Sequence, residues 1–369
     1  HFNKRDMKLK IYLMALAGFM AFVSCTDEYR ESADEPLNNN VIRFSATTQR
    51  GSRAGDITTN NLTSFNVYAY LASSGSVFMD DVNVTKGSDN TWTYSPVKYW
   101  PEEALNFYAY APNSWVPSTG PLEKVDYDNS YGLDDLVYAV SLGRTQPTSQ
   151  EDAQVRFNFR HALSKFNMMI SSANANISVK VATITLVGLS QKGSFSFPKA
   201  STDATGADVP AESVGTWSDL SSPFAYPVFM AQDQDEVLEL TPTPIDPNAE
   251  GHFAQYIIPQ GLAWVDGGDY TNSDYIQIDL SIYDPETGAK IWPNKNTPAS
   301  DIVVSSKNGD GRIKFPVSTS TIKEWKPGYH YIYNVVINGH HDIGEIEFGE
   351  PTVDTFVEVN TDYDFPASE

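Results

Sequence analysis

Short runs of alternating polar and apolar side chains dominate this sequence. They include Ser64–Tyr70, Leu105–Tyr110, Val155–Phe159, Tyr275–Ile282 and Tyr329–Ile337, whereas no helical heptad pattern is sustained. Because successive side chains of a strand point to opposite faces, a two-residue period predicts strands with one buried face. Clusters of Gly, Asn, Asp, Ser and Pro separate the runs, as turns do in antiparallel sheets. The pattern predicts an all-β protein built of antiparallel sandwiches.

The segment from His161 to Ile170 is ambiguous between helix and strand. Its composition is compatible with a short helix. However, Phe157 and Phe159 before it and Phe166 within it follow the two-residue period. We therefore expect one long strand with a bulge.

Two β-sandwich domains are expected from length and composition. A domain takes about 150 residues as a prior, and a polar break in composition falls at Ser171–Asn176. We therefore expect an N-terminal domain over residues 54–172 and a C-terminal domain over residues 173–369, the second opening with the strand Val179–Leu186. The polar stretches expected to form surface loops of the second domain are 199–213 and 284–306.

Residues 1–24 are predicted to include a signal peptide. The basic Met7–Lys10 precedes the apolar Ile11–Val23, which is shorter than the roughly 20 residues needed to cross a bilayer. Cys25 follows, as in a bacterial lipobox, where the cysteine becomes the lipidated first residue of the mature protein. Phe22 departs from the usual Leu of that motif. The alternative is an ordinary signal peptide followed by an incidental cysteine.

Charge and cysteine content exclude several classes of protein. The formal net charge of −22 opposes binding to phosphate backbones, so we expect no nucleic-acid partner. Cys25 is the single cysteine of the sequence. Without an intrachain disulfide, the stability of an exported chain must come from its hydrophobic cores.

Catalytic signatures are missing from the sequence. It contains no Gly-x-Ser-x-Gly elbow, His-Glu-x-x-His motif, phosphate loop or dinucleotide-binding glycine pattern. His340–Asp342 and the acidic group at 233–236 are interpreted as a turn and a solvated face rather than as metal sites. We therefore predict a protein that is not an enzyme and has no cofactor or metal.

The first predicted strand is Val41–Thr47, and an arginine-containing loop, Gln49–Ala54, follows it directly. Ile42, Phe44 and Ala46 fall on one face of this strand. If the strand were lost, it would leave an apolar trench and unpaired strand edges. Such a trench is a template for a strand from another chain.

Several short motifs follow one another along the sequence. They are Lys98–Pro101, Leu105–Pro112, Phe157–Lys165, Gly193–Phe197, Ile257–Gln260 and Trp325–Tyr331. Behind a lipobox and an arginine loop, this order resembles the fimbrillin family, the subunits of the type V pili of Bacteroidales. The resemblance implies two transthyretin-like β-sandwich domains and delivery to the cell surface as an outer-membrane lipoprotein.

The resemblance also implies a maturation step and a way of assembling. An arginine-specific protease cuts the loop after the first strand, which would release residues 25–53 as a lipidated propeptide. Arg53 best matches the family's arginine and Arg50 is the second candidate, while a solvated loop that nothing cuts remains the alternative. A strand of the next subunit, usually carboxy-terminal, then fills the groove, which is the apolar trench left by the released strand.

A candidate donor strand lies near the carboxyl end. The segment Thr352–Asn360 alternates, with Val353, Thr355, Val357 and Val359 on one face. The alternative is that this segment is the ordinary last strand of the second domain.

The expected function is therefore that of a structural pilus subunit that supports adhesion. Its expected partners are other pilus subunits, an arginine-specific protease, the outer membrane through the lipid on Cys25, and a host or bacterial surface ligand. The alternatives are a tip adhesin or an anchor subunit of the same pilus, and a monomeric glycan-binding lipoprotein of the cell surface. The sequence does not separate them.

Overall fold

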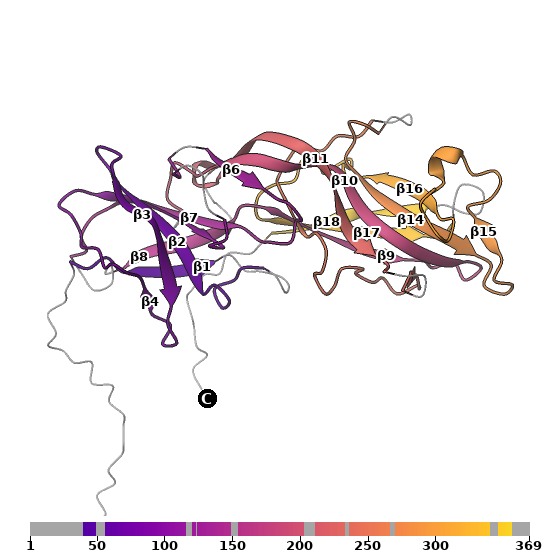
Figure 1. Ribbon diagram of the computed structural model, residues 1–369, viewed down its shortest axis with the longest axis horizontal. Coiled ribbons are helices and arrows are strands. Elements are labelled where there is room, and N and C mark those ends of the chain that lie inside the picture. The colour runs from indigo at the N-terminus through magenta and orange to yellow at the C-terminus, as the bar shows by residue number, and fades with distance from the viewer. Residues whose placement is uncertain are drawn as a thin grey trace, which may run out of the picture. The chain divides into compact units, whose positions relative to one another are not determined.

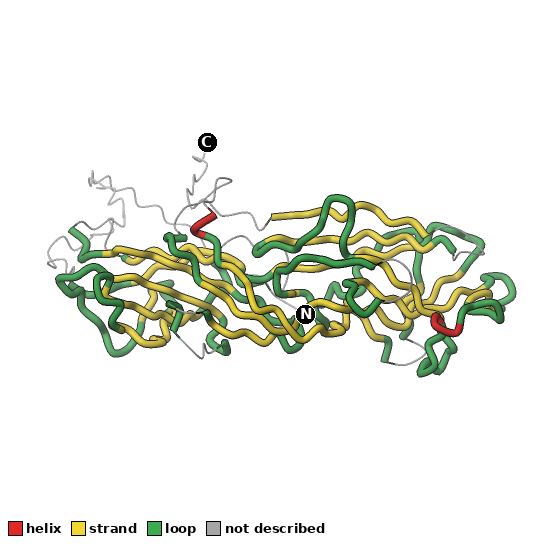
Figure 2. The backbone as a smooth tube through the Cα atoms, turned by 90° about the horizontal axis from the view of Figure 1, so that it is seen from above, coloured by secondary structure: helices red, strands yellow, loops and turns green. Residues whose placement is uncertain are grey.

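The computed structural model describes residues 40–48, 56–115, 120–122, 124–148, 154–202, 211–232, 236–265, 270–339 and 346–355, the last range by its backbone alone. Strands account for nearly all regular structure in these ranges (Figures 1 and 2), and the helical elements are two short 3-10 turns, η1 (Ala211–Ser213) and η2 (Ala299–Asp301). No helix of the described part is long and apolar enough to cross a membrane.

The strands are β1 (Phe44–Thr48), β2 (Ser64–Leu71), β3 (Val77–Lys86), β4 (Trp92–Thr93), β5 (Leu105–Ala111), β6 (Val125–Asp128), β7 (Val137–Arg144), β8 (Val155–His161), β9 (Ser164–Ser171), β10 (Ser178–Ser196), β11 (Thr216–Met230), β12 (Leu238–Glu239), β13 (Tyr256–Ile257), β14 (Tyr275–Tyr283), β15 (Lys290–Trp292), β16 (Gly311–Pro316), β17 (Tyr329–Ile337) and β18 (Ile346–Thr355).

The first sheet has the strand order β1-β8-β7-β5-β2-β3-β4. β1 runs parallel to β8, and the other neighbours are antiparallel. β8 pairs with β7 through only two residue pairs, Val137 with His161 and Tyr138 with Arg160. The rings of Phe157 on β8 and Phe65 on β2 nevertheless lie 5.6 Å apart. The sheet therefore folds over on itself and encloses a core.

Two further sheets enclose the second half of the chain. One has the order β11-β10-β14-β15, with β6, β12 and β16 as side branches, and the other has the order β13-β9-β17-β18. β9 and β17 are parallel, whereas β18 is antiparallel to β17. β10 is the longest strand and also pairs with β6 from the first half of the chain. The two halves thus share strand pairing as well as side-chain packing.

Most strands predicted from the two-residue period are confirmed. β2, β5, β8, β14 and β17 cover the five alternating runs, and β10 contains the segment Val179–Leu186. The all-β fold class is likewise confirmed. The described residues from Asn40 onward form one compact unit, and the division at residues 172/173 stays a prediction.

Two details of the prediction are wrong. The segment around His161 is not one long strand, because the chain leaves the first sheet after β8 and enters the third sheet as β9 after Ala162 and Leu163. The stretch 284–306 is not a plain loop, because β15 pairs with β14 and η2 follows. In both places the pairing partner lies far away in sequence, and local periodicity carries no information about it.

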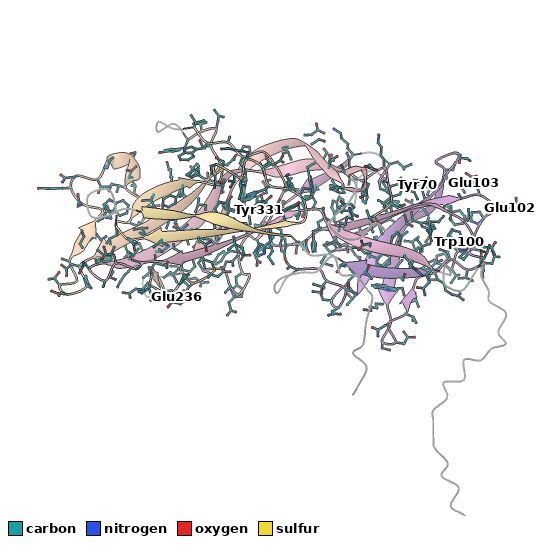
Figure 3. All side chains as sticks on the ribbon, turned by 180° about the vertical axis from the view of Figure 1, so that it is seen from behind. Tyr70, Trp100, Glu102, Glu103, Glu236 and Tyr331 are labelled. Atoms are coloured by element: carbon teal, nitrogen blue, oxygen red, sulfur yellow. The ribbon has the colours of Figure 1, made fainter. Side chains whose placement is uncertain are left out.

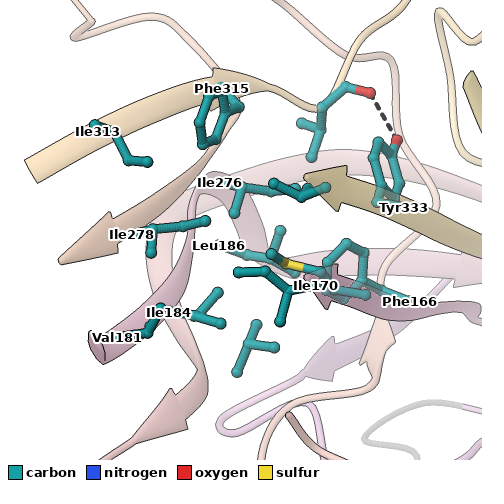
Figure 4. Close-up of a cluster of buried hydrophobic side chains, with 14 of the residues drawn as sticks. Phe166, Ile170, Val181, Ile184, Leu186, Ile276, Ile278, Ile313, Phe315 and Tyr333 are labelled. Atoms are coloured by element: carbon teal, nitrogen blue, oxygen red, sulfur yellow. Dashed lines mark hydrogen bonds between the residues drawn. The ribbon is translucent and has the colours of Figure 1, made fainter. Parts of the chain in front are cut away.

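Buried side chains form three clusters, and Figure 3 labels one residue of each: Trp100, Tyr70 and Tyr331. The cluster of Trp100 fills the first sheet. The cluster of Tyr70 joins tyrosines of β2, β5 and β7 to residues of β10 and β13. The cluster of Tyr331 lies between the second and third sheets (Figure 4), where Tyr333 donates a hydrogen bond to the carbonyl of Val317 at 2.6 Å.

The packing around Trp292 gives a test of this core. A Cβ at buried Gly311 would overlap the indole ring of Trp292, whereas a Cβ at Gly261 would meet no atom within 4 Å. Overpacking a core costs about 1–3 kcal/mol. We expect Gly311→Ala to lower the thermal unfolding midpoint by several degrees and the matched Gly261→Ala to leave it nearly unchanged. Equal midpoints would contradict the placement of Trp292.

Candidate strand-exchange site

The segment before β1 is held by two backbone hydrogen bonds to a neighbouring turn. The amide of Ile42 donates to the carbonyl of Lys98 at 3.0 Å, and the amide of Trp100 donates to the carbonyl of Asn40 at 2.8 Å. The hydroxyl of Tyr94 also donates to the carbonyl of Ile42 at 2.8 Å. Burial raises the pKa of Tyr94, so this hydroxyl stays protonated and remains a donor near neutral pH.

β1 itself lies at the end of the strand order. It pairs in parallel with β8, from Phe44 opposite Val155 to Thr48 opposite Phe159, and the amide of Val155 donates to the carbonyl of Arg43 at 2.8 Å. Within the described part of the chain, β8 is its only ladder partner. An end strand can be removed without breaking a ladder on its other side.

The side chain of Phe44 lies in a box of four aromatic rings. Its centroid is 5.3 Å from that of Tyr94, 5.6 Å from Phe157, 5.9 Å from Phe107 and 6.3 Å from Phe65. These rings come from β2, β5, β8 and the segment after β4. Phe44 therefore occupies the centre of the first sheet's core although it belongs to a five-residue edge strand.

The predicted inward face can now be placed residue by residue. Ile42 is fully buried and Phe44 is 2% exposed, while Ala46 is partly buried and packs against the same cluster. Arg43 points to solvent. Burying Ile42 and Phe44 stabilises the docked strand by about 1.5–3 kcal/mol each. If β1 departed, the aromatic rings that now surround Phe44 would line an empty trench.

The loop after β1 contains both predicted cleavage positions. Arg50 and Arg53 lie outside the described residues, as does Cys25. A hydrogen bond joins the residues before and after this loop: the amide of Thr48 donates to the hydroxyl of Thr59 at 2.9 Å.

The predicted donor segment is partly described. The backbone of β18 pairs with β17, with Val353 opposite Tyr331 and Thr355 opposite Tyr329. Val357 and Val359 lie outside the described residues. β18 is the end strand of its sheet, and this in-chain pairing corresponds to the alternative in which the segment closes the second domain. Its role as a donor stays a prediction.

A buried polar cluster next to this region escaped the sequence analysis. Asp56 contacts Lys165, and Asp135 contacts His161 at 2.9 Å; the four side chains are at most 1% exposed. The amide of Ile57 donates to Asp135 at 2.8 Å. The available signal was the charged residues of the segment 160–165, which interrupt an otherwise apolar stretch. Within the described ranges, no three His, Cys, Asp or Glu residues are grouped to hold a metal ion.

The chain matches one known protein family over most of its length. A profile described as fimbrillin-like matches residues 52–355. Among curated proteins, none matches the sequence significantly. Solved structures that resemble it include a protein from Bacteroides uniformis, with 14% identity, a TM-score of 0.46, and coverage of 88% of this chain and 100% of that one.

Two further structures carry fimbrial names. A fimbrial protein from Bacteroides vulgatus has 15% identity and a TM-score of 0.46, with coverage of 86% of this chain and 100% of its own. The fimbrial anchor protein Mfa2 from Porphyromonas gingivalis has 11% identity and a TM-score of 0.35, with coverage of 86% and 100%.

The aromatic box predicts how firmly β1 is held. Replacing a buried Phe by Ala costs about 3–5 kcal/mol. If β1 opens locally, Phe44→Ala should accelerate hydrogen exchange of the amides of Ile42, Trp100 and Val155 by at least about a hundredfold. Arg43→Ala is the matched control, since its side chain is exposed and its carbonyl is retained. Equal exchange in both variants would show that Phe44 does not hold the strand.

Proposed function

Because this chain belongs to the fimbrillin-like family, we propose that it is a structural subunit of a surface pilus that assembles by strand exchange. The observation that carries the proposal is the position of β1. This short end strand fills the centre of a core with Phe44, and residues 49–55, which contain two arginines, follow it directly. A single cut in that segment would separate β1 covalently from the rest of the chain.

The proposed maturation begins at the membrane. The lipid on Cys25 anchors the exported chain, and an arginine-specific protease cuts after Arg53, with Arg50 as the second position. The segment 25–53 then leaves with Ile42 and Phe44. The vacated groove has apolar walls from Phe65, Phe107 and Phe157. Along one side of it, β8 has lost the strand with which it was paired. A strand that offers an apolar face and backbone hydrogen bonds can replace both contributions.

The proposed donor is the carboxy-terminal segment of the next subunit. β18 lies at the end of its sheet, so it can leave without breaking a second ladder. Val353, Thr355, Val357 and Val359 would face the groove. Repetition of this exchange gives a homo- or heteropolymer, and adhesion to a host or bacterial surface ligand would be a property of the polymer.

A tip subunit of the same pilus is the second candidate. A tip needs the groove but no donor strand. The in-chain pairing of β18 with β17 is the arrangement that such a subunit would keep.

Limited proteolysis with trypsin tests the cut. We expect the first cleavage of the folded protein within Gln49–Ala54 and a new amino terminus at Ala54 or Gly51, because proteases cut connecting segments more readily than paired strands. Arg53→Ala should slow this cut, and Arg50→Ala together with Arg53→Ala should abolish both cleavage and fibre formation seen by negative-stain microscopy. A first cut within residues 173–369 would count against the proposal.

A charge on the proposed donor face tests the exchange. In Val357→Asp, an unpaired carboxylate would have to enter an apolar groove, which costs several kcal/mol or requires a proton. We expect cleavage to stay normal, fibre yield to fall strongly, and the melting temperature of the monomer to change little. Glu358→Asp is the control, because in an alternating strand position 358 would face away from Val357. A destabilised monomer with normal fibres would assign the segment to the core of its own domain.

A further inference from the structure

Lys165 and Asp56, which are far apart in the sequence, contact each other in the interior of the protein. Nζ of Lys165 on β9 lies 2.5 Å from Oδ1 of Asp56, which follows the loop after β1. Both side chains are 0% exposed. The two residues are 109 positions apart, so their contact joins the third sheet to the beginning of the first half of the chain.

Tyr256 completes the arrangement. It stands directly opposite Lys165 where β13 pairs with β9, so the two side chains share one face of the sheet. Its hydroxyl donates to the same Oδ1 of Asp56 at 2.7 Å, and its ring lies 5.4 Å from Nζ of Lys165. The amine, the carboxyl group and a hydrogen-bond donor are thus held together without solvent exposure.

Burial changes the chemistry of such a pair. A buried ion pair loses the hydration of both charges, and this loss can exceed the attraction between them. Passing the proton from the ammonium to the carboxylate removes both charges at once. The neutral pair consists of an amine nucleophile beside a carboxylic acid, and a desolvated lysine amine is an effective nucleophile.

We propose that Lys165 and Asp56 condense to form an intramolecular amide bond. The lone pair of Nζ attacks Cγ of Asp56, and a C–N bond forms. The C–O bond to one carboxyl oxygen then breaks, and this oxygen leaves with two protons as water. One amine and one carboxylic acid become one amide and one water, without any oxidant, cofactor or second protein.

Tyr256 polarises the carboxyl group in this step. Burial raises the pKa of Tyr256, and the nearby carboxylate of Asp135 raises it further. Its hydroxyl therefore stays protonated and donates to the oxygen on which negative charge develops during the attack. The fixed contact of the reacting groups replaces the activation by a nucleotide that amide formation between free molecules requires.

The bond would have a mechanical consequence that does not depend on the proposed pilus function. Asp56 is the first described residue after the loop that follows β1, so the amide would fix the chain at this point to β9. β1 could then depart while the residues from 56 onward stay attached. Force applied to the first sheet would pass to the third sheet through a covalent bond.

Intact mass of the denatured full-length protein tests the proposal. We expect the wild type to be lighter than its sequence by one water, and Lys165→Arg and Asp56→Ala to have their full sequence masses. In Asp56→Asn, the same attack would expel ammonia and give the mass of the linked wild type. After trypsin digestion, a branched peptide should join Ala54–Lys86 to His161–Lys180, uncut after Lys165.

An unlinked wild type would contradict the proposal. A folded wild type with its full sequence mass and an ordinary tryptic cut after Lys165 would show that the contact is only an ion pair and would overturn the proposal. Tyr256→Phe addresses the role of the hydroxyl, and we expect water loss to be about a hundredfold slower, as for removal of one donor from an oxyanion. An unchanged rate would overturn that role.

Discussion

The burial of Phe44 among four aromatic rings is the contact on which the first sheet depends. The ring comes from a five-residue end strand, yet it touches β2, β5 and β8 at once. Here a strand with a single ladder partner among the described residues supplies a central side chain. Loss of β1 would therefore remove a central side chain of this core, and any strand that took its place would have to supply a similar apolar group.

The contacts between the sheets, unlike those of Phe44, combine aromatic rings with buried polar pairs. Tyrosines of β5 and β7 pack against Phe195 and Phe197 near the end of β10, and polar pairs such as Asp135 with His161 are also buried. Buried polar groups are tolerated only with their partners in place, so they fix one arrangement of the strands. Asp56 and Lys165 belong to this fixed part, whereas β1 makes none of these polar contacts in the described residues. β1 is therefore separated from these polar contacts between the sheets.

Periodicity predicted most of this structure, and the parts it missed have a common cause. The alternating runs identified β2, β5, β8, β14 and β17, and the parity of Ile42 and Phe44 identified which face of the first strand is buried. The break at Ala162 and Leu163 was missed because β8 and β9 have the same period although they belong to different sheets. The three-residue β15 forms through pairing with β14 rather than through its own composition. The contact of Asp56 with Lys165 spans 109 positions, and single charged residues in a sequence do not show which partner they meet.

Binding of the first strand as a separate peptide would test the central claim most directly. The protein can be produced from Ala54 to Glu369, without β1, and titrated by calorimetry with a peptide of residues 40–48. If β1 fills an exchangeable groove, we expect saturable binding of one peptide per protein, weaker binding when the peptide carries Phe44→Ala, and no binding to the full chain, whose groove is occupied. Binding of equal strength to both proteins, or to neither while both remain folded, would contradict the claim that β1 fills an exchangeable groove.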